Sequence, residues 1–89
     1  MAESRTHEVR LLVTARRQLL RVPTRIRSRV GNAIRALASD PRPPGCKKLA
    51  GSTDYYRIRV SDYRVLYEVR DRDVLVLVIK IGHRREVYR

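Results

Sequence analysis

Residues 56–69 restrict the fold more than any other stretch, because apolar and charged side chains alternate on both sides of a two-residue turn, Ser61-Asp62. Closing this turn pairs the apolar positions with one another: Val60 with Tyr63, Ile58 with Val65, and Tyr56 with Tyr67. A shift of one residue would set the apolar positions of one strand against the charged positions of the other. The sequence therefore predicts an antiparallel hairpin with one apolar and one charged face.

One strand and two helices are expected before the hairpin. Residues 7–14 alternate between charged and aliphatic side chains and predict a first strand that ends at Thr14. Thr14 would then cap a short helix over residues 15–21. A second helix would begin at Pro23 and end at the sequence SDP, with a solvated arginine face opposite an apolar stripe. The members of that stripe are Ile26, Val30, Ala33, Ile34 and Leu37.

The remainder of the chain predicts a loop and a further strand. Residues 40–54 hold three prolines and two glycines and are expected to form a surface loop that delivers Lys47 and Lys48. Residues 74–81 are apolar on both faces and predict a third strand inside the sheet. The whole of residues 1–89 is thus expected to be one α+β domain. It would contain an N-terminal strand, two helices and a three-stranded antiparallel meander, with the helices packed on one face of the sheet.

The charge of the chain indicates an anionic partner. Lysine and arginine number 21 against 9 aspartates and glutamates, giving a net charge of +12 and a pI near 11.2. Such an excess opposes compaction, and contacts with nucleic-acid phosphates are its commonest use. A basic surface that only keeps the chain in solution is the alternative. A membrane surface is disfavoured, because the sequence shows no basic amphipathic helix with a broad apolar face.

The cysteine content and the apolar runs bear on location and on metal binding. Cys46 is the single cysteine, which excludes an internal disulfide and fits a reducing cytosol. The first ten residues lack the apolar core of a signal peptide, and residues 74–79 are too short an apolar run to span a bilayer. We therefore expect a cytoplasmic protein without a membrane partner. One cysteine, two distant histidines and no clustered carboxylates predict neither a metal site nor a cofactor.

Three arginines gather on the charged face of the predicted hairpin. Arg59 would lie directly opposite Arg64, with Arg57 two residues along on the same face. Like charges directly opposite one another destabilise a sheet by roughly 0.2–1 kcal/mol, so stability does not explain this arrangement. Glu68 on the same face would offset part of the repulsion in a purely structural interpretation. In a functional interpretation, guanidinium groups from two strands bind phosphate.

The closing sequence GHRREVYR would extend this set if it folded back over the sheet. His83, Arg84, Arg85 and Tyr88 would then lie at the edge of the arginine face. Positive surroundings would favour the neutral form of His83 and make it a possible base, while Tyr88 would stack on a nucleobase. RNA suits such a site, because its own 2′-hydroxyl can attack the neighbouring phosphate. The protein then needs only to orient the backbone, stabilise charge and move protons.

Two motifs make the sequence similar to a known family. The pattern L.G....YRIRV.DYRVLYEV and the closing GHRREVYR resemble the RelE toxins of the RelE/ParE superfamily, and the likeness covers roughly the whole chain. The resemblance implies a RelE-like fold and a metal-independent, ribosome-dependent endoribonuclease that cuts mRNA in the ribosomal A site and halts translation. It also implies mRNA, the ribosome with its 16S rRNA, and a cognate RelB-like antitoxin as partners, toxin and antitoxin forming a hetero-oligomer.

The resemblance also assigns roles to residues. Arg57, Arg59, Arg64, Arg84 and Tyr88 match the acting positions of the family, and Lys47, Lys48 and Arg85 would bind RNA. Arg64 would stabilise the phosphorane, Arg84 would serve the leaving oxygen, and Tyr88 would stack on or orient the nucleotide. Studied members carry lysines in place of Arg57 and Arg59, and arginine does not lose its proton and so cannot act as a base. His83 is therefore the hypothetical general base, with Lys47 or Lys48 as alternatives.

Two other functions stay open at this point. A ParE-like toxin of the same fold would inhibit DNA gyrase without cutting RNA, although that branch tends to lack the full basic set present here. A non-catalytic, basic RNA-binding or ribosome-associated protein would be served equally well by this size and charge.

Overall fold

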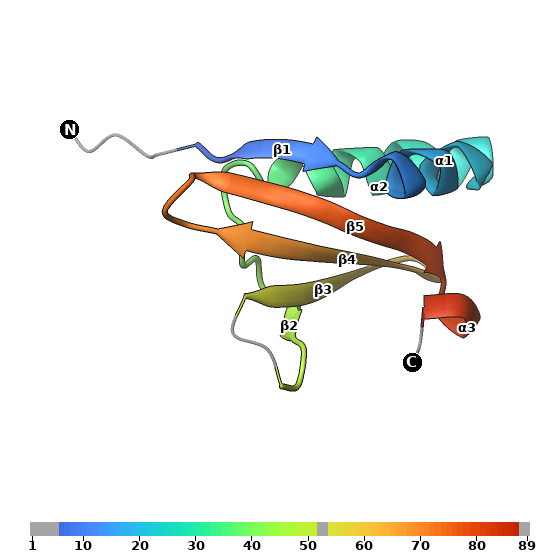
Figure 1. The fold of residues 1–89 in the computed structure, drawn as a ribbon. Coiled ribbons are helices and arrows are strands. Elements are labelled where there is room, and N and C mark those ends of the chain that lie inside the picture. Colours follow the sequence, from blue (N-terminus) through green and yellow to red (C-terminus); the bar gives the residue numbers. More distant parts are fainter. Residues whose placement is uncertain (1–5, 52–53, 88–89) are drawn as a thin grey trace.

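A five-stranded mixed sheet is the framework of the fold (Figure 1). The computed structural model describes residues 6–51 and 54–87, and the strands follow the order β1-β5-β4-β3-β2. The elements are β1 (Glu8–Leu11), α1 (Val13–Arg21), α2 (Thr24–Ala36), β2 (Lys47–Lys48), β3 (Tyr55–Val60), β4 (Tyr63–Arg70), β5 (Leu75–His83) and α3 (Arg84–Val87). β1 runs parallel to β5, and the other neighbours are antiparallel. The expected α+β class is confirmed.

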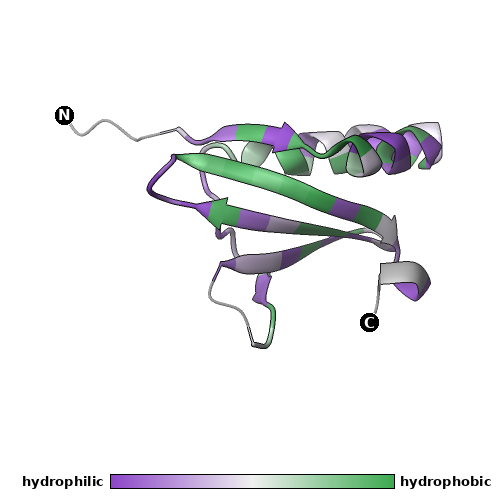
Figure 2. Ribbon diagram, in the orientation of Figure 1, coloured by the Kyte–Doolittle hydropathy of each residue, from purple (hydrophilic) through white to green (hydrophobic). Residues whose placement is uncertain are grey.

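The hairpin of β3 and β4 has the predicted register. The observed pairs are Val60 with Tyr63, Ile58 with Val65, and Tyr56 with Tyr67. β5 lies between β1 and β4, as expected for a strand that is apolar on both faces. Figure 2 shows most of β5 as hydrophobic, in contrast to the mixed character of β3 and β4.

The core lies between one face of the sheet and the two longer helices. α1 contacts β5 and β1, and α2 contacts α1 and β3. The buried apolar residues are Ala15, Val22, Val30, Ile34, Leu37, Tyr56, Ile58, Val65, Tyr67, Val69, Val76, Val78 and Ile81. The predicted stripe of the second helix is confirmed, since its members are either buried in this core or packed against it. Among the described helices, none is both long enough and apolar enough to cross a membrane.

The boundary between β1 and α1 differs from the prediction. The strand stops at Leu11, Leu12 is extended, and the helix begins at Val13. Thr14 therefore lies inside the helix, and no side-chain hydrogen bond caps α1. Val13, which the prediction placed in the strand, is the first residue of the helix and is 67% exposed. A stretch of only a few residues fits the apolar spacing of a strand and of a helix alike. The pattern alone therefore does not locate the residue at which the strand ends and the helix begins.

The segment predicted as a continuous loop contains a short strand. Lys47 and Lys48 form β2, which pairs with Arg57 and Tyr56 of β3 and makes that edge of the sheet. Two lysines carry no periodic signal, so the sequence pattern could not reveal this strand. The pairing fixes the two lysines on opposite faces of the sheet, because successive side chains of a strand alternate.

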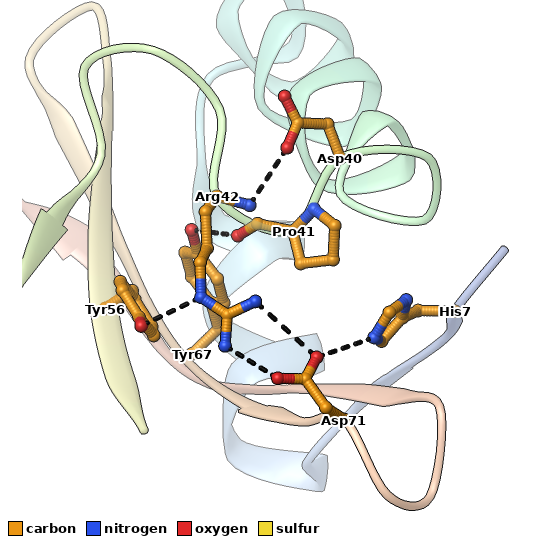
Figure 3. A network of polar contacts seen from close by, with 7 residues as sticks. All are labelled: His7, Asp40, Pro41, Arg42, Tyr56, Tyr67 and Asp71. Carbon is orange, nitrogen blue, oxygen red and sulfur yellow. Dashed lines mark hydrogen bonds and ion pairs between the residues drawn. The ribbon is translucent and has the colours of Figure 1, made fainter. Parts of the chain in front are cut away.

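A cluster of polar contacts ties the chain after α2 to the sheet (Figure 3). Arg42 Nη2 donates a hydrogen bond to Asp71 Oδ2 at 2.9 Å, and Arg42 Nε donates to the Tyr56 hydroxyl at 2.9 Å. The hydroxyl of Tyr67 donates to the carbonyl oxygen of Pro41 at 2.8 Å. Both tyrosines belong to the core. The loop is therefore held against the same face that the helices cover, and it leads directly into β2.

Replacing Asp71 with asparagine is expected to remove a pH-dependent part of the stability. Hydrogen bonds from Arg42 and His7 hold the pKa of the Asp71 carboxyl below its ordinary value. Because the folded pKa lies below the unfolded one, this stabilisation is fully present above about pH 4 and is lost as the pH falls through the folded pKa. The Asp71 side chain is 60% exposed, so we expect at most about 1 kcal/mol at pH 7.

Urea unfolding of the Asp71→Asn variant and of the unchanged protein, at pH 7 and at about pH 2.5, measures this contribution. The difference in unfolding free energy between the two proteins must shrink at the lower pH. An equal difference at both pH values would contradict the assignment.

Candidate nucleic-acid interface

The face of the sheet opposite the helices carries two neighbouring rows of basic side chains. In the first row Arg59 on β3 faces Arg64 on β4, as the sequence predicted. In the second row Lys47 on β2 faces Arg57 on β3. Paired residues on neighbouring strands point to the same face, so these cations from three strands share one surface.

Lys80 on β5 joins the second row and was missed by the sequence analysis. β3 and β4 pair Arg57 with Leu66, and β4 and β5 pair Leu66 with Lys80, whose side chain is exposed. The available signal was a single charged residue inside an otherwise apolar strand. Lys47, Arg57, Arg59, Arg64 and Lys80 are called the basic rows below.

A bulge in the pairing of β4 and β5 determines which β5 residues reach the basic rows. The register shifts between Leu66 and Tyr67, so that Leu66 pairs with Lys80 and Tyr67 with Val78. Val78 is buried beneath the helices, and without the shift Lys80 would follow it onto the same face. The extra residue instead turns Lys80 to the open face.

Arg64 is the most enclosed member of the basic rows. Arg64 is only 7% exposed, and its Nε and Nη1 atoms are shielded from solvent. It lies between Arg59 on one side and Gly82 on the other. Charges interact more strongly in such partly dehydrated surroundings than in water. An anion that reaches Arg64 would therefore be held more firmly than one bound by an exposed arginine.

The expected position of His83 on the arginine face is wrong. His83 pairs with Tyr63, and the two rings meet edge to face with centroids 5.5 Å apart. Together with Gln18 and Arg21 of α1 it lines a cavity of ≈ 230 Å³ on the helix side of the sheet. The bulge is the physical reason, because it reverses the alternation of β5 beyond Val78. The proposed role of His83 as general base thereby loses its geometric support.

The remaining candidate residues are distributed around the basic rows. Lys48 pairs with Tyr56 and so points away from the face that carries Lys47. Arg84 and Arg85 open the short helix α3 and are exposed, and the backbone N–H of Arg84 donates to the carbonyl oxygen of Asp62 at 2.8 Å. This bond holds the start of α3 at the β3–β4 turn, near Arg59 and Arg64 in the chain. Tyr88 lies outside the described residues.

Among the described strand residues, Glu68 is the acidic side chain closest in register to the basic rows. Glu68 forms an ion pair with Arg70 on its own strand, with 3.2 Å between Oε1 and Nε. Glu68 pairs with Tyr55 and Leu77. These three residues lie one row further from Arg59 and Arg64 than the row that contains Arg57. Within the described part of the chain, His, Cys, Asp and Glu form no group of three or more that could hold a metal ion. The chemistry of the surface is therefore that of guanidinium and ammonium groups, which bind phosphates.

Comparison with known proteins relates this scaffold to bacterial toxins. Residues 9–88 match the family model described as ParE toxin of type II toxin-antitoxin system, parDE. The chain is 33% identical over 87 residues to Toxin RelG of Mycobacterium tuberculosis, covering 93% of this chain and 97% of that protein.

Solved structures agree with the sequence matches. The toxin-antitoxin complex RelBE2 from Mycobacterium tuberculosis contains a chain with 29% identity and a TM-score of 0.78, covering 94% of this chain and 98% of that one. The isolated E. coli RelE toxin has 29% identity and a TM-score of 0.78, covering 92% of this chain and 90% of that one. The family match over residues 9–88 includes every strand that contributes to the basic rows.

Proposed function

We propose an activity for this chain, which belongs to the RelE/ParE family of toxins of type II toxin-antitoxin systems. The proposed activity is that of an endoribonuclease which cuts mRNA in the ribosomal A site. In the proposed step the 2′-oxygen of one nucleotide attacks the adjacent phosphorus, and the bond to the 5′-oxygen of the next nucleotide breaks. A base takes the 2′-hydroxyl proton, and the leaving 5′-oxygen gains a proton. The products end in a 2′,3′-cyclic phosphate and a 5′-hydroxyl, and translation in the cytoplasm stops.

The observation that carries the proposal is the pairing of like charges in the basic rows. Arg59 faces Arg64 directly across the strands, an arrangement that is unfavourable for the fold alone. A pentacovalent phosphorane bears more negative charge than the phosphodiester from which it forms. Cations already fixed around it stabilise the transition state more than the ground state, which is the requirement for catalysis.

The proposed roles follow from position and chemistry. Arg64, enclosed at the centre of its row, would stabilise the phosphorane oxygens, while Arg57 and Arg59 would orient the RNA backbone. Arg84 would serve the leaving oxygen, and Tyr88, Lys48 and Arg85 stay candidates for RNA contact. The ribosome would supply the correct presentation of mRNA, since phosphate contacts alone carry no sequence information.

Lysines of the basic rows are the proposed source of the general base. Arginine keeps its proton at all accessible pH values, whereas lysine can give it up when neighbouring cations disfavour its charge. Lys80 shares a row with Arg57 and lies next to the row of Arg64. Lys47 stands at the other end of the same row. Of these two, Lys80 comes from the strand adjacent to Arg64.

Replacing Lys80 by arginine is expected to lower single-turnover cleavage on mRNA-programmed ribosomes by about 10²-fold, because the positive charge stays but a guanidinium cannot accept the 2′-hydroxyl proton. Lys47→Arg serves as the matched control and should leave the rate within about twofold. If Lys47→Arg abolished cleavage and Lys80→Arg stayed active, Lys47 rather than Lys80 would be the general base. An unchanged rate in both variants would remove lysine from the role of base.

A cognate RelB-like antitoxin is the proposed partner that keeps the toxin inactive. The related chain from Mycobacterium tuberculosis was solved as a toxin-antitoxin complex, which supports a hetero-oligomer for this chain too. An antitoxin that covers the basic rows would block access of RNA phosphates and would supply the negative charge that a chain of net charge +12 lacks.

The matched family model carries the ParE name, so inhibition of DNA gyrase is the second candidate function. One experiment separates the two. The protein is induced in cells, mRNA 5′ ends are mapped by primer extension, and plasmid supercoiling is measured in the same cultures. New ends within translated codons are expected here. A supercoiling defect without new ends would favour gyrase, and neither effect would favour a non-catalytic RNA-binding protein.

A further inference from the structure

A hollow lies where the beginning of α2 meets the β3–β4 turn. Arg25, Ile26 and Arg29 of α2 line it together with Ser61 of the turn, and its volume is ≈ 270 Å³. Arg25 and Arg29 are exposed and one helical turn apart, so both can reach the same group. Sites for drug-sized ligands begin at about 300 Å³. This hollow therefore suits something smaller, such as a phosphate with part of its sugar.

The electrostatic character of this region is strongly positive. Residues 9–39 contain no aspartate or glutamate, although they include both longer helices and many arginines. The first turn of α2 has no acidic side chain to balance the positive end of the helix dipole. Arg25 and Arg29 also repel one another at their i, i+4 spacing. Helix stability thus does not account for the placement of these two arginines, and a bound anion would.

Ser61 connects the hollow to the basic rows. It follows Arg59 by two residues, which keeps the two Cα atoms within about 7 Å of one another. Its hydroxyl can donate a hydrogen bond to a phosphate oxygen, and its backbone has a positive φ of 56° that makes the tight turn. An extended RNA backbone can therefore pass from Arg59 around the turn to Arg25 and Arg29.

We propose that the hollow formed by Arg25, Arg29 and Ser61 binds a phosphodiester group of RNA and continues the RNA-binding surface from the basic rows onto α2. The inference deepens the proposed function and rests on it, because the anion is taken to be RNA. Two guanidinium groups and a hydroxyl match the tetrahedral oxygens of a phosphate. An acidic protein segment fits less well, because Ile26 alone lines the hollow with an apolar side chain, whereas protein interfaces centre on apolar anchors.

The test compares Ser61→Asp with Ser61→Asn. Both side chains tolerate a positive φ and have nearly the same size, so the variants differ essentially in one negative charge beside Arg25 and Arg29. Binding to a ten-nucleotide RNA with 2′-O-methyl groups, which cannot be cut, is measured by fluorescence anisotropy. Ser61→Asp is expected to weaken binding about tenfold, and Ser61→Asn by no more than about twofold. Equal affinities of the two variants both for this RNA and for ribosomes that lack mRNA would overturn the proposal.

A second set of variants assigns the effect to the hollow. Arg25→Gln/Arg29→Gln should reduce the slope of log affinity against log salt concentration by about 0.7, the value for one phosphate contact on a single strand. In this double variant the difference between Ser61→Asp and Ser61→Asn should disappear, and both should bind RNA with the same affinity. Arg16→Gln/Arg17→Gln removes the same charge from α1 outside the hollow and should preserve that difference. A difference that persists without Arg25 and Arg29 would place the effect elsewhere and overturn the proposal.

Two sources of RNA are separated by running the same variants on ribosomes that lack mRNA. Weaker binding of Ser61→Asp to the short RNA alone identifies a contact with mRNA, and weaker binding to empty ribosomes identifies a contact with rRNA; either result supports the proposal. A loss confined to antitoxin binding overturns it. None of these measurements requires cleavage. The proposal for the hollow can therefore be refuted while the proposed ribonuclease activity is confirmed, and the ribonuclease activity can be refuted while the hollow is shown to bind RNA.

Discussion

Replacing Arg64 by glutamine is expected to lower single-turnover cleavage of mRNA on programmed ribosomes by about 10²–10³-fold, the effect of removing one preorganised charge-stabilising donor from a transition state. Arg64 is the most enclosed member of the basic rows, and a charge acts more strongly in such surroundings than in water. Arg64→Lys keeps the charge but loses the planar fork, and should lose about tenfold.

Arg70→Gln is the matched control for this prediction. Arg70 is an exposed arginine of the same strand, paired with Glu68 and outside the basic rows, and its replacement should leave the cleavage rate within about twofold. Because Arg64 faces Arg59, its loss also removes a like-charge contact, and the fold should keep its cooperative unfolding. Cleavage by Arg64→Gln at the rate of Arg70→Gln would contradict the role of Arg64.

Truncating Tyr67 to alanine is expected to lower the free energy of unfolding by about 3–5 kcal/mol. The side chain is fully buried on the middle strand of the sheet and stacks on Tyr56 with ring centroids 6.0 Å apart. Small domains have roughly 0.05–0.15 kcal/mol of stability per residue, so this loss is a large share of the total. It would also release Pro41, and with it the chain that leads to Lys47.

Tyr67→Phe separates the packing of the ring from its hydroxyl. Burial raises the pKa of the Tyr67 hydroxyl well above its ordinary value, so the group keeps its proton and donates to Pro41 at every accessible pH. Its removal should lower the unfolding free energy by about 1 kcal/mol. Urea unfolding followed by far-UV circular dichroism measures both variants. A Tyr67→Ala protein within about 1 kcal/mol of the unchanged chain would contradict the assigned role.

Local patterns predicted the parts of the fold that have a clear period. The register of β3 and β4 follows from alternation on both sides of a two-residue turn, and the same register predicted that Arg59 faces Arg64. The second helix follows from its apolar stripe. These features depend on residues close together in the chain, where spacing alone determines which side chains share a face.

Features that depend on distant pairing were not predictable from the pattern. The bulge between β4 and β5 leaves no trace in the sequence, because residues 75–79 are apolar at odd and even positions alike. That single extra residue decides that Lys80 joins the basic rows and that His83 does not. β2 was missed for a related reason, since two residues are too few to show a period.

The position of β5 between β1 and β4 determines when the sheet can close during synthesis of the chain. Translation supplies β1 and β4 before β5, and within the described residues β1 has β5 as its only sheet neighbour. Contacts between residues as distant as Glu8 and Leu75 also form slowly. Lys80 arrives with that same late strand. For most of its synthesis the chain therefore lacks both the closed sheet and the complete set of basic rows, which form together when β5 joins β1 and β4.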